Sequence, residues 1–328
     1  MPVIPRLAMR LFLGVDGGQS GTTAVVGDEA GHILGEGHAG PCNHAASSQG
    51  RVRFAGAIIA SVRAALDRAG IEQTTFEAAC FGFSGGPADK NALTRELVKA
   101  KRYFITHDAW TALAGATAGK PGVIAIAGTG SIAFGRNSDD RTARAGGWGY
   151  IFGDEGGAFD VVRQALRAVL RNEEGWGPPT ALRNSLLEIT GAASANDLLH
   201  RCYTDELPRD RIAALAPLVD QAAGSGDPMA QDILKSAAQS LAMLIAAVRG
   251  QLFAPGENIA VTYAGGVFRS PVFRERFRML VELEADNHVA APRFQPAEGA
   301  LIEAYRLAGI SNPARLLDAG RERAGDYE

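Results

Sequence analysis

The chain has 328 residues, of which 46% are hydrophobic and 21% are charged. This composition is typical of a globular protein, and the length is about twice that of a single domain, so we expect two domains. With 33 basic and 36 acidic residues, the formal net charge is only −3. That balance gives no electrostatic footprint for nucleic acid or for an anionic membrane, so we expect neither partner and instead a small molecule.

The cysteines and the apolar segments indicate where in the cell the protein is expected. Cys42, Cys80 and Cys202 are far apart and form no CxxC pair, so neither a disulfide framework nor a zinc site is expected. The opening segment has a short apolar run before Asp16 and lacks a cleavage site of small residues, which argues against a signal peptide. No stretch approaches the roughly 18 apolar residues of a membrane span. We therefore expect a cytoplasmic protein.

The first part of the chain alternates strands and helices, the pattern of a sheet with packed crossover helices. Short β-type runs are joined by glycine turns, and apolar residues then recur at helical spacing. The expected elements are three antiparallel strands over 11–38, a helix over 47–69, a strand within 76–86, a helix near 88–100 and a strand over 102–107. This part ends near Gly119, and we place a first domain at residues 1–118.

The second part begins like the first, with a strand, a glycine turn and a returning strand. This echo predicts two related sheet domains. The expected elements are strands over 122–136 and 142–149, helices over 155–253 with breaks at 175–179 and 224–228, strands over 258–268 and within 281–291, and a helix over 297–308. We place the second domain, with its helical insertion, at residues 119–328. Packing of its last helix on the first domain is the alternative to this boundary.

Three glycine turns, each after a β-type run, indicate phosphate binding. Glycines let backbone N–H groups approach phosphate oxygens, hydroxyls add donors, and a carboxylate can hold hydrated Mg²⁺. A plain hairpin turn is the alternative, because DG and GG pairs favour turns. The candidates are Gly17, Gly18, Gln19 and Thr22 with Asp16 for the metal, then Gly128, Thr129 and Gly130, and then Gly265 and Gly266.

Two rival nucleotide motifs fail on spacing. The segment at 115–121 is one residue short of a P-loop and ends in proline. No GxGxxG fingerprint follows a predicted strand, which removes the main support for hydride chemistry.

Phosphoryl transfer to an alcohol needs a carboxylate that accepts the hydroxyl proton. Asp108 is the best candidate, because it lies between a predicted strand and a predicted helix, where loop residues point into a cleft. The alternative is that Asp108 caps the helix that follows, and the two roles can coexist.

The segment 146–157 has six glycines, two acids and several aromatic residues. Carboxylates that pair with hydroxyls and a tryptophan that covers an apolar ring face are typical of a sugar site. A hinge loop whose acids start the next helix is the alternative. The candidate substrate ligands are Gly147, Trp148, Asp154 and Glu155, with Asn43, Ser84 and Gly85 as weaker candidates and His44 more often structural.

Several motifs in this order resemble the BadF/BadG/BcrA/BcrD ATPase family, and within it the N-acetylglucosamine and glucosamine kinases. The resemblance spans about residues 11–309 and rests on GVDGGQSGTTA, CNHA, GFSGG, ITHDAWTA, IAIAGTGSIAFG, GGWGYIFGDEGGAF and VTYAGGVF. It implies an α/β fold of two ribonuclease-H-like (actin-like ATPase) domains that flank an ATP cleft and close over a sugar.

The resemblance also implies roles for single residues. It places Asp16 in the first phosphate motif beside Mg²⁺, Gly128 to Gly130 in the second phosphate motif, and Gly265 and Gly266 in the adenosine motif. Asp108 matches the catalytic base. The positions that match sugar ligands are Asn43, Ser84 and Asp154.

We therefore expect an ATP- and Mg²⁺-dependent kinase that phosphorylates a hydroxyl of a hexose or amino sugar, and a homodimer. The chain departs from the pattern of the mammalian-type kinases at Ala45, Ile132 and Ala145, which leaves open the acceptor and the need for an N-acetyl group. The alternative is an ATPase of the same family that activates or regulates a partner protein. Activator proteins of the family bind an iron–sulfur cluster between subunits through cysteines, and the positions of the three cysteines of this chain do not fit that arrangement.

Overall fold

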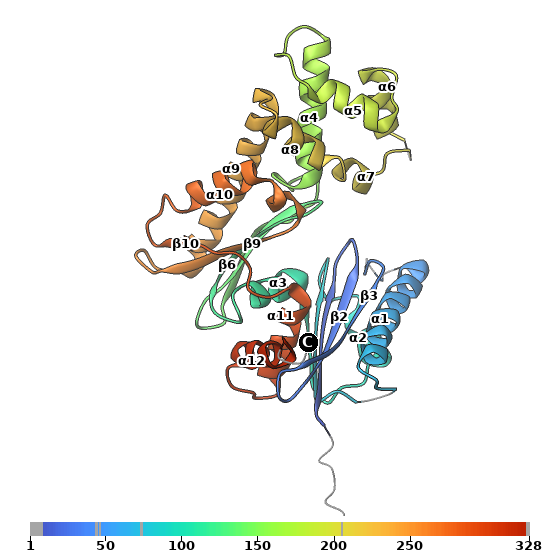
Figure 1. The fold of residues 1–328 in the computed structure, drawn as a ribbon, viewed down its shortest axis with the longest axis vertical. Helices are drawn as coiled ribbons and strands as arrows, with labels where there is room; N and C mark the ends of the chain where they lie inside the picture. Colours follow the sequence, from blue (N-terminus) through green and yellow to red (C-terminus); the bar gives the residue numbers. More distant parts are fainter. Residues whose placement is uncertain (1–8, 43–44, 46, 73–74, 205, 326–328) are drawn as a thin grey trace, which may run out of the picture. The chain divides into compact units, whose positions relative to one another are not determined.

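The computed structural model describes residues 9–42, 45, 47–72, 75–204 and 206–325, with side chains up to residue 320. The chain divides into two compact units. Unit 1 comprises residues 1–120 and 292–328, and unit 2 comprises residues 121–291. Each unit is built on one mixed sheet with helices packed on it (Figure 1).

The sheet of unit 1 has the strand order β3-β2-β1-β4-β5. Strands β1, β2 and β3 are antiparallel neighbours, whereas β1, β4 and β5 run parallel. The three antiparallel strands and the two later strands are those that the sequence predicts. The bounds are β1 Leu11–Gly17, β2 Thr22–Asp28, β3 Ile33–Ala39, β4 Ala78–Phe83 and β5 Tyr103–His107.

Helices cover both faces of this sheet (Figure 1). Along β1 the side chains alternate between them: Leu13 packs with Phe54 and Ile58 of α1, whereas Phe12 packs with Tyr305 of α11. Both faces are therefore buried, which explains the nearly continuous apolar run of β1. The helices are α1 Ser48–Arg68 and α2 Asn91–Leu97 on one face, and α3 Asp108–Ala116, α11 Pro296–Leu307 and α12 Pro313–Gly325 on the other.

The segment 292–328 groups with unit 1, whereas the sequence-based boundary assigns it to the second domain, with packing back of the last helix as an option. Helix α11 lies directly on β1 and α3. A Cβ on Gly14 would overlap the backbone of α11 at Ala297 and Leu301, so glycine in β1 allows this close approach. The boundary is a matter of long-range packing, which local sequence patterns do not contain.

The sheet of unit 2 repeats the topology of unit 1. Its order is β10-β9-β6-β7-β8, with β6, β7 and β8 antiparallel and β6, β9 and β10 parallel. The echo between the two halves of the sequence therefore has a structural counterpart. The bounds are β6 Gly122–Ala127, β7 Ser131–Arg136, β8 Thr142–Gly146, β9 Ile259–Ala264 and β10 Asn287–Val289.

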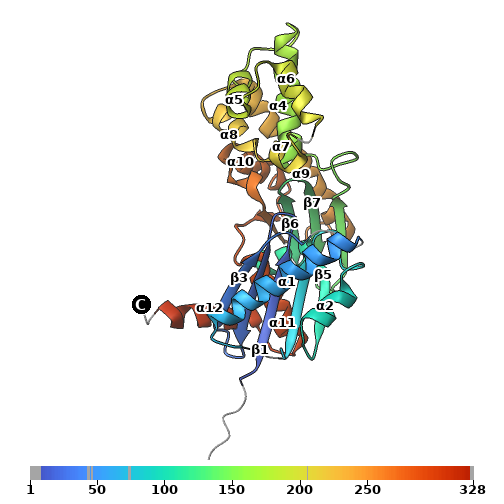
Figure 2. The same ribbon diagram turned by 90° about the vertical axis from the view of Figure 1, so that its right-hand side faces the viewer.

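The long helix α9 (Pro228–Leu252) packs on β6, β7 and β8, and α10 (Pro271–Val281) packs on α9. By length and hydropathy, α9 meets the criteria of a membrane span within the described residues, but Leu234, Leu241 and Ile245 lie in the core of unit 2. The shorter helices α4 to α8 extend from one end of this unit (Figure 2). Their bounds are α4 Ala158–Glu173, α5 Leu182–Thr190, α6 Ala195–Cys202, α7 Arg209–Ala213 and α8 Ala216–Gly224.

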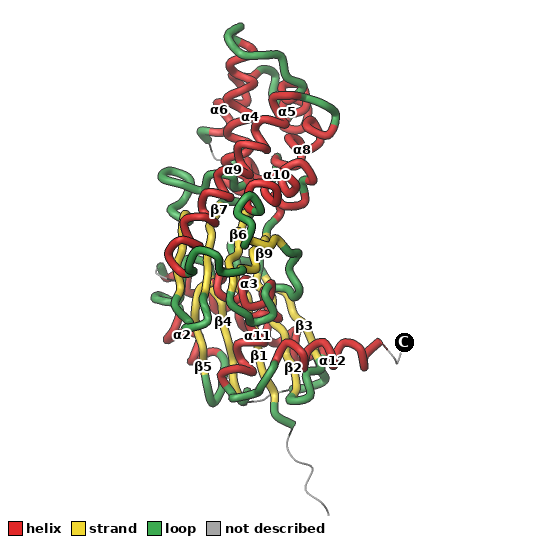
Figure 3. Tube along the Cα trace, turned by 90° about the vertical axis from the view of Figure 1, so that its left-hand side faces the viewer, coloured by secondary structure: helices red, strands yellow, loops and turns green. Residues whose placement is uncertain are grey.

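Two helices and a 3₁₀ turn are absent from the sequence-based assignment. They are α10, α12 and the turn at Gly266–Arg269. In α10 a serine cap, Ser270, accepts a hydrogen bond from the backbone N–H of Phe273, and Pro271 follows it as the first helical residue. This start signal was present in the sequence. Figure 3 shows α10 and α12 in red, with α12 extending away from the yellow strands.

Candidate functional site

The candidate residues of unit 1 gather at the carboxyl edge of its parallel strands. Asp16 lies near the end of β1, Ser84 follows β4, and Asp108 follows β5 as the first residue of α3. The register aligns Asp16 with Gly82 on β4. In open α/β sheets, ligands bind outside the carboxyl ends of the strands. We therefore expect a ligand to bind at this edge of the sheet.

Asp16 and Asp108 are connected through Thr111 of α3. The Thr111 hydroxyl lies 3.2 Å from Oδ1 of Asp16 and 2.9 Å from the backbone carbonyl of Asp108. A Cβ on Gly82 would overlap the Thr111 side chain, so the glycine in β4 brings α3 against the sheet here. The fold therefore fixes the two carboxylates relative to each other.

The pKa values of both carboxyl groups are raised, chiefly by burial. Burial, then repulsion from Asp108, raises the pKa of Asp16 to about 7, against a smaller lowering by the Thr111 hydroxyl. Burial also raises the pKa of Asp108, although the N–H of Ala109 and the Ser84 hydroxyl donate hydrogen bonds to it. A pair of carboxyl groups with raised pKa values at a sheet edge is a signature of a functional site.

Lys90 is a charged residue near this site that the sequence analysis missed. Its side chain is fully buried, and Nζ bonds to Oδ1 of Asp89 at 2.9 Å and to the carbonyl of Gly86 at 3.1 Å. Its positive charge lowers the pKa of Asp108. The sequence shows only a lysine at the start of a helix, a position that is usually exposed.

The loop after β4 joins three segments of the site. The N–H of Ser84 donates to the carbonyl of Gly17 at 2.9 Å, and Asp89 accepts from the N–H of Ala45 at 2.7 Å. Gly85 is exposed and has a left-handed backbone with φ of 72°, which favours glycine. Asn43 and His44 lie outside the described residues.

The first glycine turn closes the β1–β2 hairpin. Gly18 donates to the carbonyl of Gly21 at 2.9 Å, and Gln19 is exposed at the tip. Thr22 is buried, and its hydroxyl donates to the carbonyl of Gly40 at 2.8 Å, so this hydroxyl is used inside the hairpin. Gly17 faces Phe83 and Cys42, and a Cβ there would lie 2.8 Å from the Phe83 ring.

In unit 2 the structure brings the second and third glycine turns together. Gly128 to Gly130 connect β6 to β7, and Gly265 follows β9 with φ of 101°. A Cβ on Gly265 would overlap the carbonyl of Ala127 and lie 2.9 Å from the nitrogen of Gly128. Two segments more than a hundred residues apart thus form one surface of backbone groups, with Gly266 exposed beside it.

The start of α4 also packs on this surface. The N–H of Ala158 donates to the carbonyl of Gly128 at 2.8 Å, and the N–H of Phe159 donates to that of Thr129 at 3.1 Å. A Cβ on Gly157 would lie 2.7 Å from the carbonyl carbon of Gly130. The second glycine turn is therefore held from two sides, which fixes its backbone.

The loop 146–157 exposes apolar rings. Trp148 is 66% exposed, and the guanidinium of Arg144 lies 5.0 Å from its ring centroid. Gly147 has φ of 72°, and a Cβ there would contact Ile132. The Trp148 ring is therefore accessible at the surface of unit 2.

Asp154 lies in the same loop but is buried. Its Oδ1 accepts from the N–H of Ser131 at 3.3 Å, and its Oδ2 accepts from Nη2 of Arg209 at 2.6 Å. A Cβ on Gly130 would overlap this carboxylate. The structure therefore places Asp154 behind the second glycine turn, in contact with groups of its own unit.

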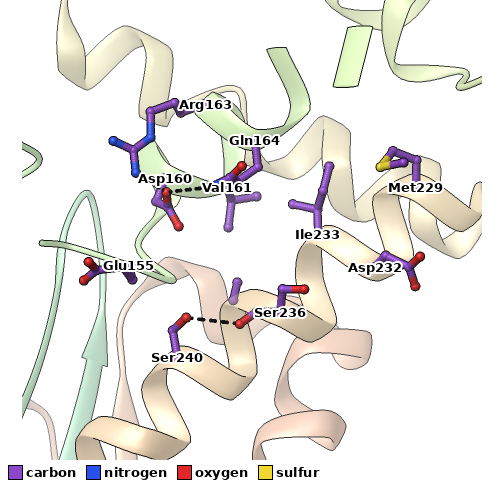
Figure 4. A pocket seen from close by; sticks show the side chains of 11 residues that line it. Glu155, Asp160, Val161, Arg163, Gln164, Met229, Asp232, Ile233, Ser236 and Ser240 are labelled. Carbon is purple, nitrogen blue, oxygen red and sulfur yellow. Dashed lines mark hydrogen bonds and ion pairs between the residues drawn. The ribbon is translucent and has the colours of Figure 1, made fainter. Parts of the chain in front are cut away.

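Glu155 is exposed and lies at the edge of a cavity of about 280 Å³ between α4 and α9, with its carboxylate directed away from the other lining side chains (Figure 4). Two further carboxylates, Asp160 and Asp232, line this cavity together with Ser236 and Ser240. Arg163 is the one cation among its lining residues and pairs with Asp160 at 2.6 Å. The excess of negative charge makes this cavity unsuited to a phosphate group.

Comparisons with known proteins identify the family of the chain. Residues 13–304 match the BadF/BadG/BcrA/BcrD ATPase family. The N-acetylmuramic acid/N-acetylglucosamine kinase of Clostridium acetobutylicum is 31% identical over 80% of this chain and 87% of its own length. The N-acetyl-D-glucosamine kinase of Dictyostelium discoideum is 31% identical over 79% of this chain and 86% of its own.

Solved structures with the same fold cover both units. A candidate N-acetylglucosamine kinase from Chromobacterium violaceum has a TM-score of 0.74 and 27% identity, and the match covers 90% of this chain and 98% of that one. A ROK family glucokinase from Streptomyces griseus has a TM-score of 0.56 and 18% identity, over 91% of this chain and 99% of that one. The second likeness shows the fold alone, an α/β fold of two ATPase-type units.

Proposed function

We propose that this chain, which belongs to the BadF/BadG/BcrA/BcrD ATPase family, is an amino sugar kinase that transfers the γ-phosphate of ATP to a hydroxyl of its acceptor. The relatives named above act, by their names, on N-acetylglucosamine and N-acetylmuramic acid, and a 24% identical relative from Vibrio cholerae is named a glucosamine kinase. The observation that carries the proposal is the pair of carboxylates, Asp16 and Asp108, fixed at the sheet edge of unit 1.

Asp108 is the general base in this proposal. Its raised pKa brings the carboxylate closer to the range in which it can accept a proton from an alcohol during transfer. The hydrogen bonds from Ala109 and Ser84 fix its orientation and lower the pKa of Asp108 against the larger effect of burial. Lys90 adds to this effect by favouring the negative charge.

Asp16 is the residue that would hold Mg²⁺. Repulsion between Asp16 and Asp108 contributes to the raised pKa of Asp16, and a bound cation would relieve that repulsion. Mg²⁺ is commonly held by one or two carboxylates together with waters and substrate phosphates, so a single carboxylate suffices. When bound, the ion neutralises charge that develops on the phosphate oxygens.

The glycine turns supply backbone donors for the nucleotide. In unit 1 these are Gly17 and Gln19, with Gly18 closing the turn through its bond to Gly21, and in unit 2 they are Gly128 to Gly130 with Gly265 and Gly266. Gln19, Gly265 and Gly266 are exposed and Gly128 to Gly130 are half-buried, so a phosphate or ribose can approach these backbones closely.

The proposed acceptor ligands come from both units. The Ser84 hydroxyl donates to Asp108 and Gly85 follows Ser84 in the chain, whereas Gly147, Trp148 and Glu155 are exposed residues of the loop 146–157 in unit 2. Asn43 remains a proposed sugar ligand from the resemblance. Asp154 remains one too, although its carboxylate bonds to Ser131 and Arg209.

The test is ADP release in the presence of Mg²⁺ with a panel of acceptors: glucose, glucosamine, N-acetylglucosamine, N-acetylgalactosamine and N-acetylmuramic acid. We expect turnover with an amino sugar at least tenfold above the rate without acceptor. Equal ADP release with and without every sugar would favour the alternative, an ATPase that acts on a partner protein. A cytoplasmic homodimer is part of the proposal, and light scattering of the purified chain tests its dimeric state.

A further inference from the structure

Unit 1 contains a second cavity, of about 610 Å³, at the opposite end of α3 from Asp108. Residues 118–120, which follow α3, form one wall, and residues 310–315, which lead into α12, form another. Its volume lies in the range of sites that hold small organic molecules. No role in the proposed reaction involves this cavity.

Cationic side chains dominate the lining. Arg293 pairs with Asp318, and Arg306 pairs with Glu303. Two more cations, Lys120 and Arg315, line the cavity.

Lys120 and Arg315 are both exposed, and neither side chain has an ion pair or hydrogen bond within the part of the chain that the structure describes. The cavity and its paired carboxylates therefore have two more positive than negative charges. Such an excess inside a concave site attracts an anion that carries two charges.

The start of α12 adds donors of a different kind. The first turn of this 13-residue helix, Pro313 to Arg315, lines the cavity. The first N–H groups of a helix have no partner inside the helix, and the helix dipole gives this end a partial positive charge. Pro313 has no N–H, so the N–H groups of Ala314 and Arg315 are the first that an anion can use. Backbone and side-chain donors thus converge on one space.

We propose that this cavity binds the phosphate group of a small phosphomonoester, and that a sugar phosphate is its ligand. A phosphomonoester carries close to two negative charges at neutral pH, which matches the excess of positive charge. The volume exceeds the need of inorganic phosphate alone. No aromatic side chain is among the lining residues, which disfavours a nucleotide base. The choice of a sugar phosphate rests on the proposed function, whereas the phosphate site does not.

The test is calorimetric titration of the full chain with inorganic phosphate, glucose 6-phosphate, N-acetylglucosamine 6-phosphate and ADP. The variant Lys120→Gln/Arg315→Gln removes the two exposed cations. The matched control, Arg63→Gln/Lys99→Gln, removes two exposed cations of unit 1 that lie outside the cavity. Both pairs lie outside the proposed catalytic and nucleotide-binding groups, so ADP release with acceptor reports correct folding.

We expect a sugar phosphate to bind the wild type more tightly than inorganic phosphate does, with affinity that falls as salt rises. The cavity variant should lose at least tenfold in affinity, and the control should stay within twofold. Saturating acceptor blocks binding of a sugar phosphate at the proposed catalytic site, so the titrations are repeated with it.

Equal affinity in the wild type and the cavity variant would overturn the proposal, as would tighter binding of ADP that the cavity variant abolishes. If the acceptor panel fails but the variant still weakens phosphate binding, the cavity stands and the amino sugar kinase does not. If the panel succeeds and the titrations show no difference, only the cavity is rejected.

Discussion

Arg209 of α7 donates from Nη2 to Oδ2 of Asp154 over 2.6 Å, and this pair links the helical insertion to the second glycine turn. The guanidinium also lies 4.9 Å from the ring centroid of Tyr150 and 5.7 Å from that of Phe159. Oδ1 of Asp154 holds the N–H of Ser131 at the end of the turn. The pair is therefore placed to fix the backbone that we propose binds nucleotide phosphates.

Removal of the guanidinium should weaken nucleotide binding. In Arg209→Gln, Asp154 loses its charged partner, and we expect the KM for ATP to rise about tenfold, which corresponds to one charge-assisted hydrogen bond. The KM for the acceptor should change less than threefold. Steady-state kinetics with each substrate varied in turn measures both. Arg211→Gln, on the same helix and exposed, is the matched control. Equal rises in both KM values would contradict a specific effect on the turn.

Asp154→Ala separates two roles of this carboxylate. If Asp154 binds substrate hydroxyls, as the resemblance implies, the acceptor affinity should fall by about 1.5 to 3 kcal/mol with ATP affinity unchanged. If it acts with Arg209 on the glycine turn, the loss should appear in ATP affinity. From the contacts of both oxygens we expect the second result. Calorimetry with acceptor alone and with a non-hydrolysable ATP analogue distinguishes them, and a variant with only the acceptor affinity reduced would contradict our expectation.

Local signals in the sequence were sufficient for the sheets. Short β-type runs and glycine turns predicted the strands on both sides of the first two glycine turns and the strand before the third, and the strand-to-helix switch predicted where Asp108 lies. Lys90 and Arg209 were not predicted, because their importance depends on partners: Lys90 on its burial, and Arg209 on a contact with a residue 55 positions earlier. No window of sequence contains such information.

The grouping of residues 292–328 with unit 1 was left open as an option for the last helix, for a related reason. The closing helix was predicted within one residue of its observed bounds, Pro296–Leu307, but the surface on which it packs was not determined by its own sequence. Gly14, whose missing side chain admits this helix, looks in sequence like any glycine of a buried strand. Such a complementarity between distant segments becomes visible only in the folded chain.

Asp108→Asn tests the general base. The change keeps the size of the side chain and its contact with the N–H of Ala109, so we expect ATP and acceptor to bind almost as in the wild type. Turnover should fall by roughly two to four orders of magnitude, the range for loss of a general base. ADP release and calorimetry measure the two properties. Asp67→Asn, on the exposed side of α1, is the control. Near wild-type turnover would remove Asp108 from the mechanism.

Lys90→Met should shift the pH dependence of turnover. Lys90 lowers the pKa of Asp108, so its loss raises that pKa and moves the acid limb of kcat to higher pH. Methionine fills a similar volume without a charge. Because the variant also leaves Asp89 without its buried partner, we expect lower stability, which thermal unfolding measures separately. An unchanged acid limb in a folded variant would show that Lys90 has a structural role only.

The raised pKa of Asp16 predicts how stability depends on pH without Mg²⁺. In the unfolded chain Asp16 ionises near the ordinary aspartate pKa of 3.8, whereas in the folded chain its pKa is about 7. Between these values the unfolded state binds fewer protons, so the stability of the wild type should fall as pH rises from 4 to 7. Asp16→Asn lacks this titration and should gain stability relative to the wild type over the same interval, by on the order of 2 kcal/mol.

The measurement is urea unfolding of both proteins at several pH values, with and without Mg²⁺. Asp16 and Asp108 interact, so the observed transition belongs to the pair. If Asp16 holds the metal, Mg²⁺ should stabilise the wild type at pH 7 and not Asp16→Asn, because bound cation favours the ionised carboxylate. Asp139→Asn, an exposed carboxylate of unit 2, controls for general effects of charge. Equal stabilisation of all three proteins by Mg²⁺ would exclude Asp16 as its ligand. A stability difference between the wild type and Asp16→Asn that does not vary with pH would contradict the raised pKa of Asp16.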